Sequence, residues 1–158
     1  MVIISNLVYR FLTSEYFTYL IFEMQSSSSG FQINDPVDAD ELFKKIRHIR
    51  NKLQLQKLAK NKTLEIVAEE LIQNETLAPI DERKMNYVTL SILSILDTFK
   101  NESTEQLIDR WLADANKRPV VLGVGNYAAL HIEYDNEEHS SGKVALIVAM
   151  IYRPKQDK

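Results

Sequence analysis

The chain has 158 residues, of which 45% are hydrophobic and 26% are charged, and its formal net charge is −3. This length and composition are typical of one soluble globular domain with its own core, and they exclude wholesale disorder and low-complexity structure. Because the chain has no cysteine, disulfide scaffolds, thiol nucleophiles and Cys-ligated metals are excluded, and its acidic balance argues against a nucleic-acid partner.

An apolar segment, residues 1–25, opens the chain, and a Ser-rich linker, residues 26–37, follows it. A membrane-spanning helix needs about 20 largely uncharged residues, and Arg10, Glu15 and Glu23 interrupt this segment. Four explanations stay open: an export signal, a surface anchor in contact with a membrane, a helix docked on the domain, or a misassigned start codon. A lipoprotein of the bacterial type would need a cysteine to acylate, which the chain lacks.

Two amphipathic helices begin the folded part of the chain. Asp38 and Glu41 form a capping-box-like start, and apolar residues at helical spacing then predict a helix over Ala39–Leu53. The apolar positions of this helix are Leu42, Phe43, Ile46, Ile49 and Leu53. A second apolar stripe predicts a helix over Thr63–Gln73.

The middle of the chain contains an ambiguous segment and a third helix. In Met85–Phe99 the apolar residues first alternate, as in a strand, and then follow a spacing that suits a helix, so both structures stay open. Ser103 and Gln106 form a capping box that begins a helix whose apolar face includes Trp111. Pro119 is expected to force extended geometry on the residue before it and to end this helix.

The period of the apolar pattern changes to two in the last part of the chain. We predict a short extended segment over Val120–Gly125, a strand over Tyr127–Tyr134 and a strand over Val144–Tyr152. The last run is apolar at nearly every position, so both of its faces must be covered, and the short connection makes the last two strands antiparallel neighbours. The predicted fold class is therefore α+β, a three-layer α-β-α sandwich with a small antiparallel sheet between helices. This domain spans 38–154, and a polar tail, 155–158, follows it.

The order of these elements, together with four sequence segments, resembles the CAP superfamily (cysteine-rich secretory proteins, antigen 5 and pathogenesis-related proteins; the SCP domain). The segments are Leu42–Leu58, which looks like the family's opening pattern; Leu64–Leu71, which looks like its second helix; Thr104–Leu112, which is similar to its Trp-ending helix; and Gly123–Gly125, which matches its Gly-Val-Gly. The resemblance covers most of the chain, from Asp38 to Pro154. It implies an α-β-α sandwich outside the cell, in a family whose members bind sterols, lipids or host proteins. Residue usage and the Ser-rich linker suggest a degenerate bacterial type, a spirochaetal outer-surface lipoprotein.

The family's metal-binding residues, located by this resemblance, are replaced in the chain. Bacterial members place a histidine six residues after the helix-ending Trp, where this chain has Lys117, and a carboxylate where it has Met85. Met and Lys⁺ are unsuitable ligands for hard or borderline cations. The resemblance therefore implies no metal, no cofactor and no catalytic residue, and it places the equivalent of the family's cleft at Met85, Asn86, Lys117 and Arg118.

A run of basic residues lies in the first predicted helix and the connection after it. Between Lys44 and Lys62 there are eight Lys or Arg and no acid. In a net-acidic protein this concentration of positive charge favours an anionic surface or a polyanion as partner. The proposed anion-binding face comprises Lys44, Lys45, Arg47, Arg50 and Lys52, and a solvated helix face that binds nothing is the alternative.

His131 and Glu133 are the local pair of residues that suits acid–base or metal chemistry. They lie two positions apart, so both side chains point to the same face of the predicted strand, and His139 follows in the next connection. Together the three residues form the site of an alternative function, a metal-dependent hydrolase. A partly exposed strand face without a metal is the competing interpretation.

These observations predict a non-enzymatic CAP-like binding module with a degenerate His/Glu metal site. The protein is expected to be secreted or at the cell surface, with anchoring in a bacterial outer membrane as one form of that location. Its partner is an unidentified protein or lipid ligand, or an anionic surface or polyanion, and not nucleic acid. The alternatives are the metal-dependent hydrolase and an intracellular interaction domain whose apolar amino terminus is buried against a partner.

Overall fold

The computed structural model describes residues 35–79 and 88–153. Its helices are α3 (Ala39–Lys52), α4 (Lys62–Asn74), α6 (Thr104–Ala113) and α7 (Arg118–Leu122). Its strands are β1 (Ala59–Lys60), β2 (Val88–Lys100), β3 (Tyr127–Tyr134) and β4 (Ser141–Tyr152). The apolar segment 1–25, most of the linker and the tail 155–158 lie outside the described residues.

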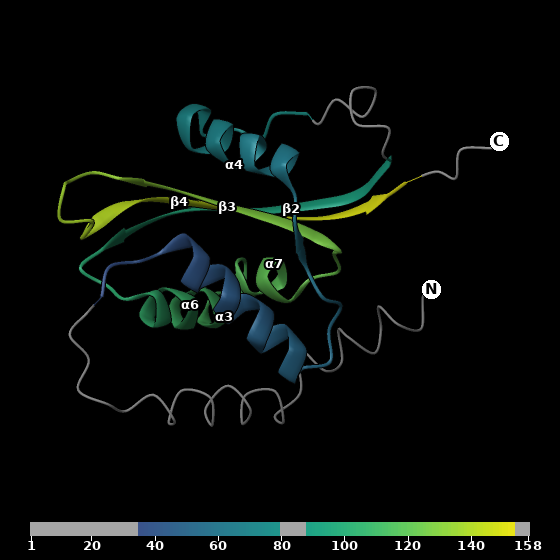
Figure 1. The fold of residues 1–158 in the computed structure, drawn as a ribbon, viewed down its shortest axis with the longest axis horizontal. Helices are drawn as coiled ribbons and strands as arrows, with labels where there is room; N and C mark the ends of the chain where they lie inside the picture. Colours follow the sequence, from purple (N-terminus) through teal and green to yellow (C-terminus); the bar gives the residue numbers. More distant parts are fainter. Residues whose placement is uncertain (1–34, 80–87, 154–158) are drawn as a thin grey trace. The chain divides into compact units, whose positions relative to one another are not determined.

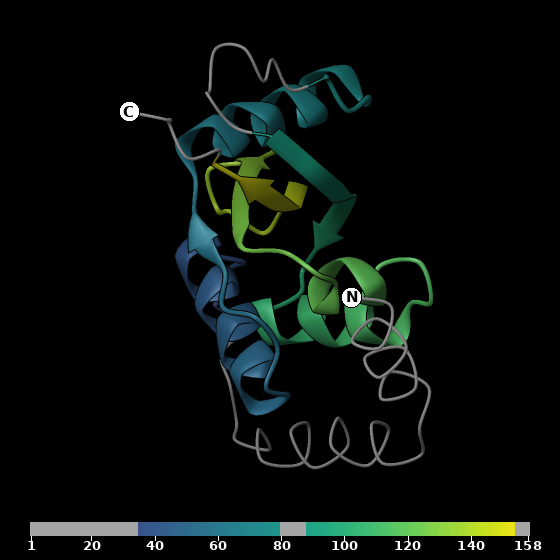
Figure 2. The same ribbon diagram turned by 90° about the vertical axis from the view of Figure 1, so that its right-hand side faces the viewer.

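The described elements form three layers (Figure 1). A four-stranded sheet with the order β1-β3-β4-β2 lies in the middle. Helix α4 covers one face of the sheet, and α3, α6 and α7 lie on the other, an arrangement that the rotated view in Figure 2 also shows. The predicted α-β-α sandwich is therefore confirmed, and the two predicted strands β3 and β4 are antiparallel neighbours as expected. The short β1, which pairs in parallel with β3, was not predicted.

Strand β2 settles the structure of the ambiguous segment from Val88 onward, which is its described part. It pairs with β4 in antiparallel fashion from Val88 to Lys100. Ile92 and Leu96 pack toward α4, while Ile95 and Phe99 are buried in the core. This alternation follows the period of a strand, and pairing with β4 over its whole length decides between the two periodicities.

Strand β4 is the centre of the core. Every residue from Val144 to Ala149 is buried, which confirms the prediction that this strand is covered on both faces. Ala145, Ile147 and Ala149 pack against α4 in one apolar cluster, and the alternate side chains face the opposite layer. The α4 interface is rich in small residues, because Ala68 of the helix and Ala129 of β3 belong to the same cluster.

Helix α7 corrects the prediction of an extended segment over Val120–Gly125. Residues Arg118–Leu122 are helical, with Pro119 in the first turn, where its missing N–H is not needed. Val120, Val121 and Leu122 are all buried, and a short apolar run of this kind does not distinguish a strand from a buried helical turn. Pro119 also does not end the preceding helix, because α6 already ends at Ala113.

The predicted capping box at the start of α6 is present, and it yields a test. The amide of Gln106 donates to Ser103 Oγ at 3.2 Å, and the amide of Ser103 donates to Gln106 Oε1 at 2.9 Å. We expect Ser103→Ala to lower the free energy of unfolding by about 1 kcal/mol, measured by urea denaturation. Ser103→Asn, which keeps the side-chain acceptor, should stay close to the wild type, and equal losses in both variants would contradict a role for the cap.

Candidate functional site

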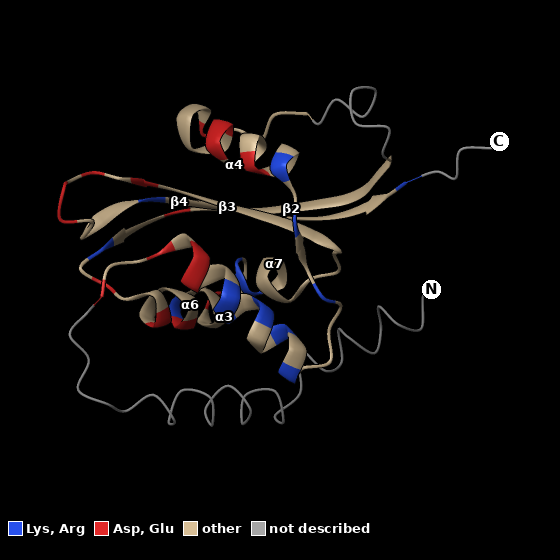
Figure 3. Ribbon diagram, viewed as in Figure 1, with Lys and Arg blue, Asp and Glu red and all other residues tan. Residues whose placement is uncertain are grey.

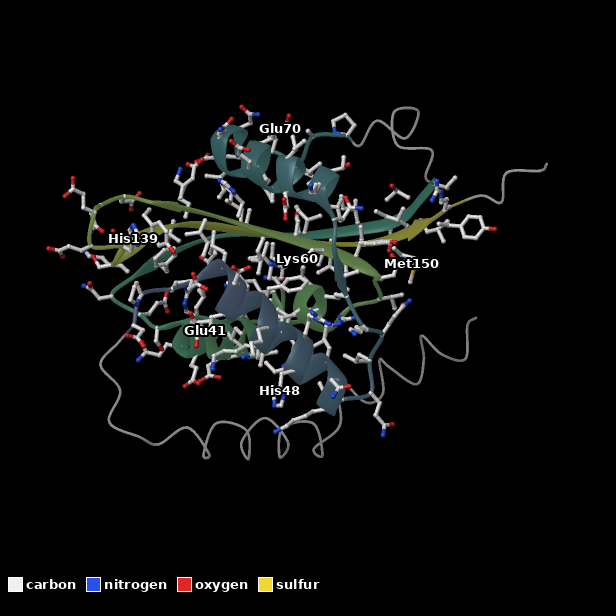
Figure 4. The ribbon with its side chains drawn as sticks, in the orientation of Figure 1. Glu41, His48, Lys60, Glu70, His139 and Met150 are labelled. Carbon is white, nitrogen blue, oxygen red and sulfur yellow. The ribbon has the colours of Figure 1, made fainter. Side chains whose placement is uncertain are left out.

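A groove of about 750 Å³ runs beside α3. Helix α3 forms one wall with Phe43, Lys44, Lys45, Arg47, His48 and Asn51, and the connection to α4 forms the other with Leu55, Lys57 and Lys60. Asp40 and Glu41 line it at the amino-terminal end of α3. In Figure 4, Glu41 and His48 lie on α3, and Lys60 lies in β1 within the connection to α4. Five of the eight basic residues between Lys44 and Lys62 therefore line the groove.

The sequence of α3 places the basic residues on the outer side of the helix. Leu42, Ile46 and Ile49 are buried and hold the helix against the core. Lys44, Arg47, His48 and Asn51 fall three or four positions apart on the exposed stripe, so their side chains point outward together. Figure 3 shows the resulting polarity, with acidic residues at the start of α3 and basic residues along the rest of it.

The cations of the groove fall into two classes. Lys45 forms an ion pair with Glu105 at 2.5 Å, and Lys60 forms one with Asp40 at 2.5 Å. Lys44, Arg47 and Lys57 form no ion pair with any carboxylate among residues 35–79 and 88–153. The groove therefore carries positive charge that the described part of the chain does not neutralise.

Arg50 corrects the prediction of the anion-binding face. Its side chain is only 1% exposed, and it points into the protein. The guanidinium donates to the carbonyl oxygen of Gln56 twice, at 3.1 and 2.9 Å, and to those of Val121 at 3.0 Å and Gly123 at 2.7 Å. Burial lowers the pKa of Arg50 to about 10, so it stays charged at neutral pH. Lys52 is exposed but does not line the groove.

Lys117 and Arg118, two of the four residues predicted as equivalents of the family's cleft, do not line the groove. Lys117 Nζ lies 3.2 Å from Asp97 Oδ2 and 3.5 Å from Asp114 Oδ2, so ion pairs hold its ammonium. Arg118 begins α7 and is half-buried. Met85 and Asn86 lie outside the described residues.

Sequence reasoning missed the carboxylate to which Lys117 binds. Asp97 of β2 accepts hydrogen bonds at Oδ2 from Trp111 Nε1 at 2.9 Å and from Arg110 at 2.7 Å. Burial raises the pKa of Asp97, but the donors from Trp111, Thr98 and Lys117, with the charge of Arg110, together lower it below its ordinary value. A carboxylate surrounded by fixed donors stays ionised and accepts hydrogen bonds, which suits a structural role rather than proton transfer.

The three residues of the alternative hydrolase do not come together. His131 Nε2 lies 3.8 Å from Glu133 Oε1. The ring of His139 instead stacks on Tyr134 at 4.0 Å, and Tyr134 points to the opposite face of β3 from His131 and Glu133 because neighbouring strand residues alternate. In the described ranges, no group of three or more His, Cys, Asp or Glu residues is arranged to hold a metal ion.

The hydroxyl of Tyr134 donates to the carbonyl of Val37 at 2.6 Å, which ties the start of α3 to β3. Burial, and secondarily the charge of Asp38, raises the pKa of this hydroxyl.

None of the helices in the described ranges combines the length and apolar character that a membrane span requires.

Comparison with solved structures establishes the fold. The chain is similar to an outer surface protein from Borrelia burgdorferi, with a TM-score of 0.54 and 18% sequence identity, over 75% of this chain and 98% of that one. It is also similar to a cysteine-rich secretory protein from Staphylococcus aureus, with a TM-score of 0.48 and 12% identity, over 70% of this chain and 38% of that one. No family model and no curated protein matches the sequence. The first similarity and the arrangement of layers confirm the predicted three-layer α-β-α fold.

Proposed function

We propose that this chain is a non-enzymatic CAP-like binding module, secreted or held at a cell surface, that binds an anionic ligand in the groove beside α3. The observation that carries the proposal is the set of cations in the groove, Lys44, Arg47 and Lys57, that no described carboxylate pairs. Unpaired cations in a concave site concentrate positive potential and attract anions. The unidentified protein or lipid partner expected from the sequence would therefore present negative charge to this groove.

The contacts that the carboxylates and histidines make support the non-enzymatic part of the proposal. Lys117, which stands at the family's histidine position, is held by Asp97 and Asp114. His139 stacks on Tyr134, away from the pair His131 and Glu133.

Activity as a metal-dependent hydrolase would contradict the non-enzymatic part of the proposal. We expect zinc titrations by calorimetry to give no stoichiometric binding, and binding that His131→Ala abolishes would overturn the proposal.

The surface location is supported by the similar solved structures, which are named as an outer surface protein and as a secretory protein. Anchoring in a bacterial outer membrane through residues 1–25 is the finer form of this proposal. Fractionation of the native protein with amino-terminal sequencing tests export, processing and anchoring together. Recovery of the intact chain only in the cytoplasm would contradict a surface location.

The anion-binding part predicts salt-dependent retention of the full chain. At low ionic strength we expect the protein to be retained on immobilised heparin, a generic polyanion, or on vesicles that contain phosphatidylglycerol. Retention should fall as salt is added, because exposed charges are screened over about 10 Å at 0.1 M salt. Absence of retention on both supports at low ionic strength would contradict anion binding.

A further inference from the structure

We infer that the ligand of the groove is a linear sulfated polysaccharide, an inference that rests on the proposed anion binding and names its ligand class. The alternative occupant with the same charge is the surface of an anionic bilayer. Three features of the groove, its shape, its apolar residues and its polar side chains, distinguish the two.

The shape of the groove favours a chain over a membrane surface. Its cations lie on two walls, with Lys44 and Arg47 on α3 and Lys57 on the connection that follows it. A polymer chain can lie between the walls and contact both at once. A bilayer is planar and contacts the residues that protrude furthest, so it would leave a volume of about 750 Å³ largely unfilled.

The apolar residues of the groove do not suit insertion into lipid. Peripheral membrane proteins bury exposed apolar side chains at the interface. Phe43 is only 4% exposed, and Arg47 and Lys60 lie over its ring at 5.9 and 5.4 Å from the ring centroid. Leu55 is half-buried. The covered ring also argues against single-stranded nucleic acid, which binds by stacking its bases on exposed aromatic rings.

The polar side chains on α3 suit a ligand that carries both charges and hydroxyls along its length. Lys44, Arg47, His48 and Asn51 lie at successive intervals of three, one and three residues along the exposed stripe, over roughly 10 Å of helix. The cations suit sulfates, and the Asn51 amide and the His48 imidazole offer hydrogen bonds to sugar hydroxyls. Asp40 and Glu41 place negative charge at one end of the groove, so a polyanion is repelled there and extends toward the other end.

The test compares two charge-matched variants of the full chain. Lys44→Gln with Lys57→Gln removes one cation from each wall, and Lys62→Gln with Lys100→Gln removes two exposed cations outside the groove. We expect the groove variant to bind heparin about tenfold more weakly, and the control variant to bind as the wild type does. Lys44→Arg with Lys57→Arg should restore binding, and this variant keeps the test valid if the Gln substitutions disturb folding.

The vesicle arm separates this inference from the proposed function. Phosphatidylcholine vesicles with and without phosphatidylglycerol isolate the part of binding that depends on charge from any contribution of the apolar segment 1–25. Heparin binding that needs the groove cations, with little charge-dependent vesicle binding, supports the inference. Vesicle binding that is stronger and needs the same cations overturns the polysaccharide but leaves anion binding intact. Equal losses in both charge-matched variants overturn the groove as the site, and no binding to either probe overturns anion binding as well.

Discussion

Arg50→Met is expected to lower the free energy of unfolding by about 3–5 kcal/mol, the largest effect of any change considered for this chain. The guanidinium is buried and donates four hydrogen bonds to the carbonyl oxygens of Gln56, Val121 and Gly123. Methionine fills a similar volume but donates nothing, so these three carbonyl oxygens lose their hydrogen-bond donor. The change also disconnects α3 from both the turn at Gln56 and the end of α7.

Urea denaturation followed by circular dichroism measures this loss, and Arg47→Met is the matched control. Arg47 lies on the exposed side of the same helix, so its replacement should change the free energy of unfolding by no more than about 0.5 kcal/mol. The loss in free energy of unfolding for Arg50→Lys should lie between the losses for Arg47→Met and Arg50→Met, because an ammonium cannot reach three carbonyls in the geometry of the guanidinium. A loss for Arg50→Met that equals the loss for Arg47→Met would show that the buried guanidinium is dispensable.

Asp97→Asn is expected to lower the free energy of unfolding by about 2 kcal/mol at neutral pH. The amide keeps the size of the side chain but loses the charge that Arg110 and Lys117 contact, and its single oxygen cannot accept from both Trp111 Nε1 and the Thr98 amide. Trp111 is fully buried, so its N–H cannot turn to water for a new partner. Arg110 is partly exposed, so solvent screens its ion pair with Asp97. The expected loss of stability for Asp97→Asn is therefore smaller than that for Arg50→Met.

The pH dependence of this effect follows from the lowered pKa of Asp97. The folded-state pKa lies below the unfolded value of about 3.9, so the stabilisation is complete above that value and is lost as the pH falls through the folded-state pKa. The asparagine side chain does not titrate, so the difference between wild type and variant should shrink as the solution becomes acidic. Asp135→Asn, at an exposed position in the β3–β4 connection, serves as control. A gap between wild type and Asp97→Asn that stays constant on acidification would contradict this account.

Much of the fold could be predicted because local signals and packing agree. The caps at Asp38 and Ser103 set the starts of α3 and α6, and the fully apolar β4 required a layer on each side. Helix α7 and strand β1 could not be predicted. The first is a single buried turn whose apolar run has no period, and the second has two residues that become a strand only by pairing with β3.

The candidate site was predictable as a run of charge but not as a groove. The sequence places basic residues together, whereas their separation into two walls depends on how the connection after α3 folds back. The inward position of Arg50 does have a sequence signal, because it follows Ile46 by four residues and so falls on the apolar side of the helix. No pattern in the sequence around Asp97 indicates its role, because Arg110, Trp111 and Lys117 come from α6 and from the connection after it. These residues meet Asp97 only in the folded chain.

The alanines between α4 and the sheet restrict where this protein can be altered. Ala68 of the helix packs in the same cluster as Ala129, Ala145 and Ala149 of the two central strands, so the helix lies close to the sheet. A larger side chain at any of these positions would force the layers apart, at a cost of roughly 1–3 kcal/mol. Engineered cavities or new specificities are therefore better introduced around the outer side of α3, where side chains can change size without separating two layers of the core.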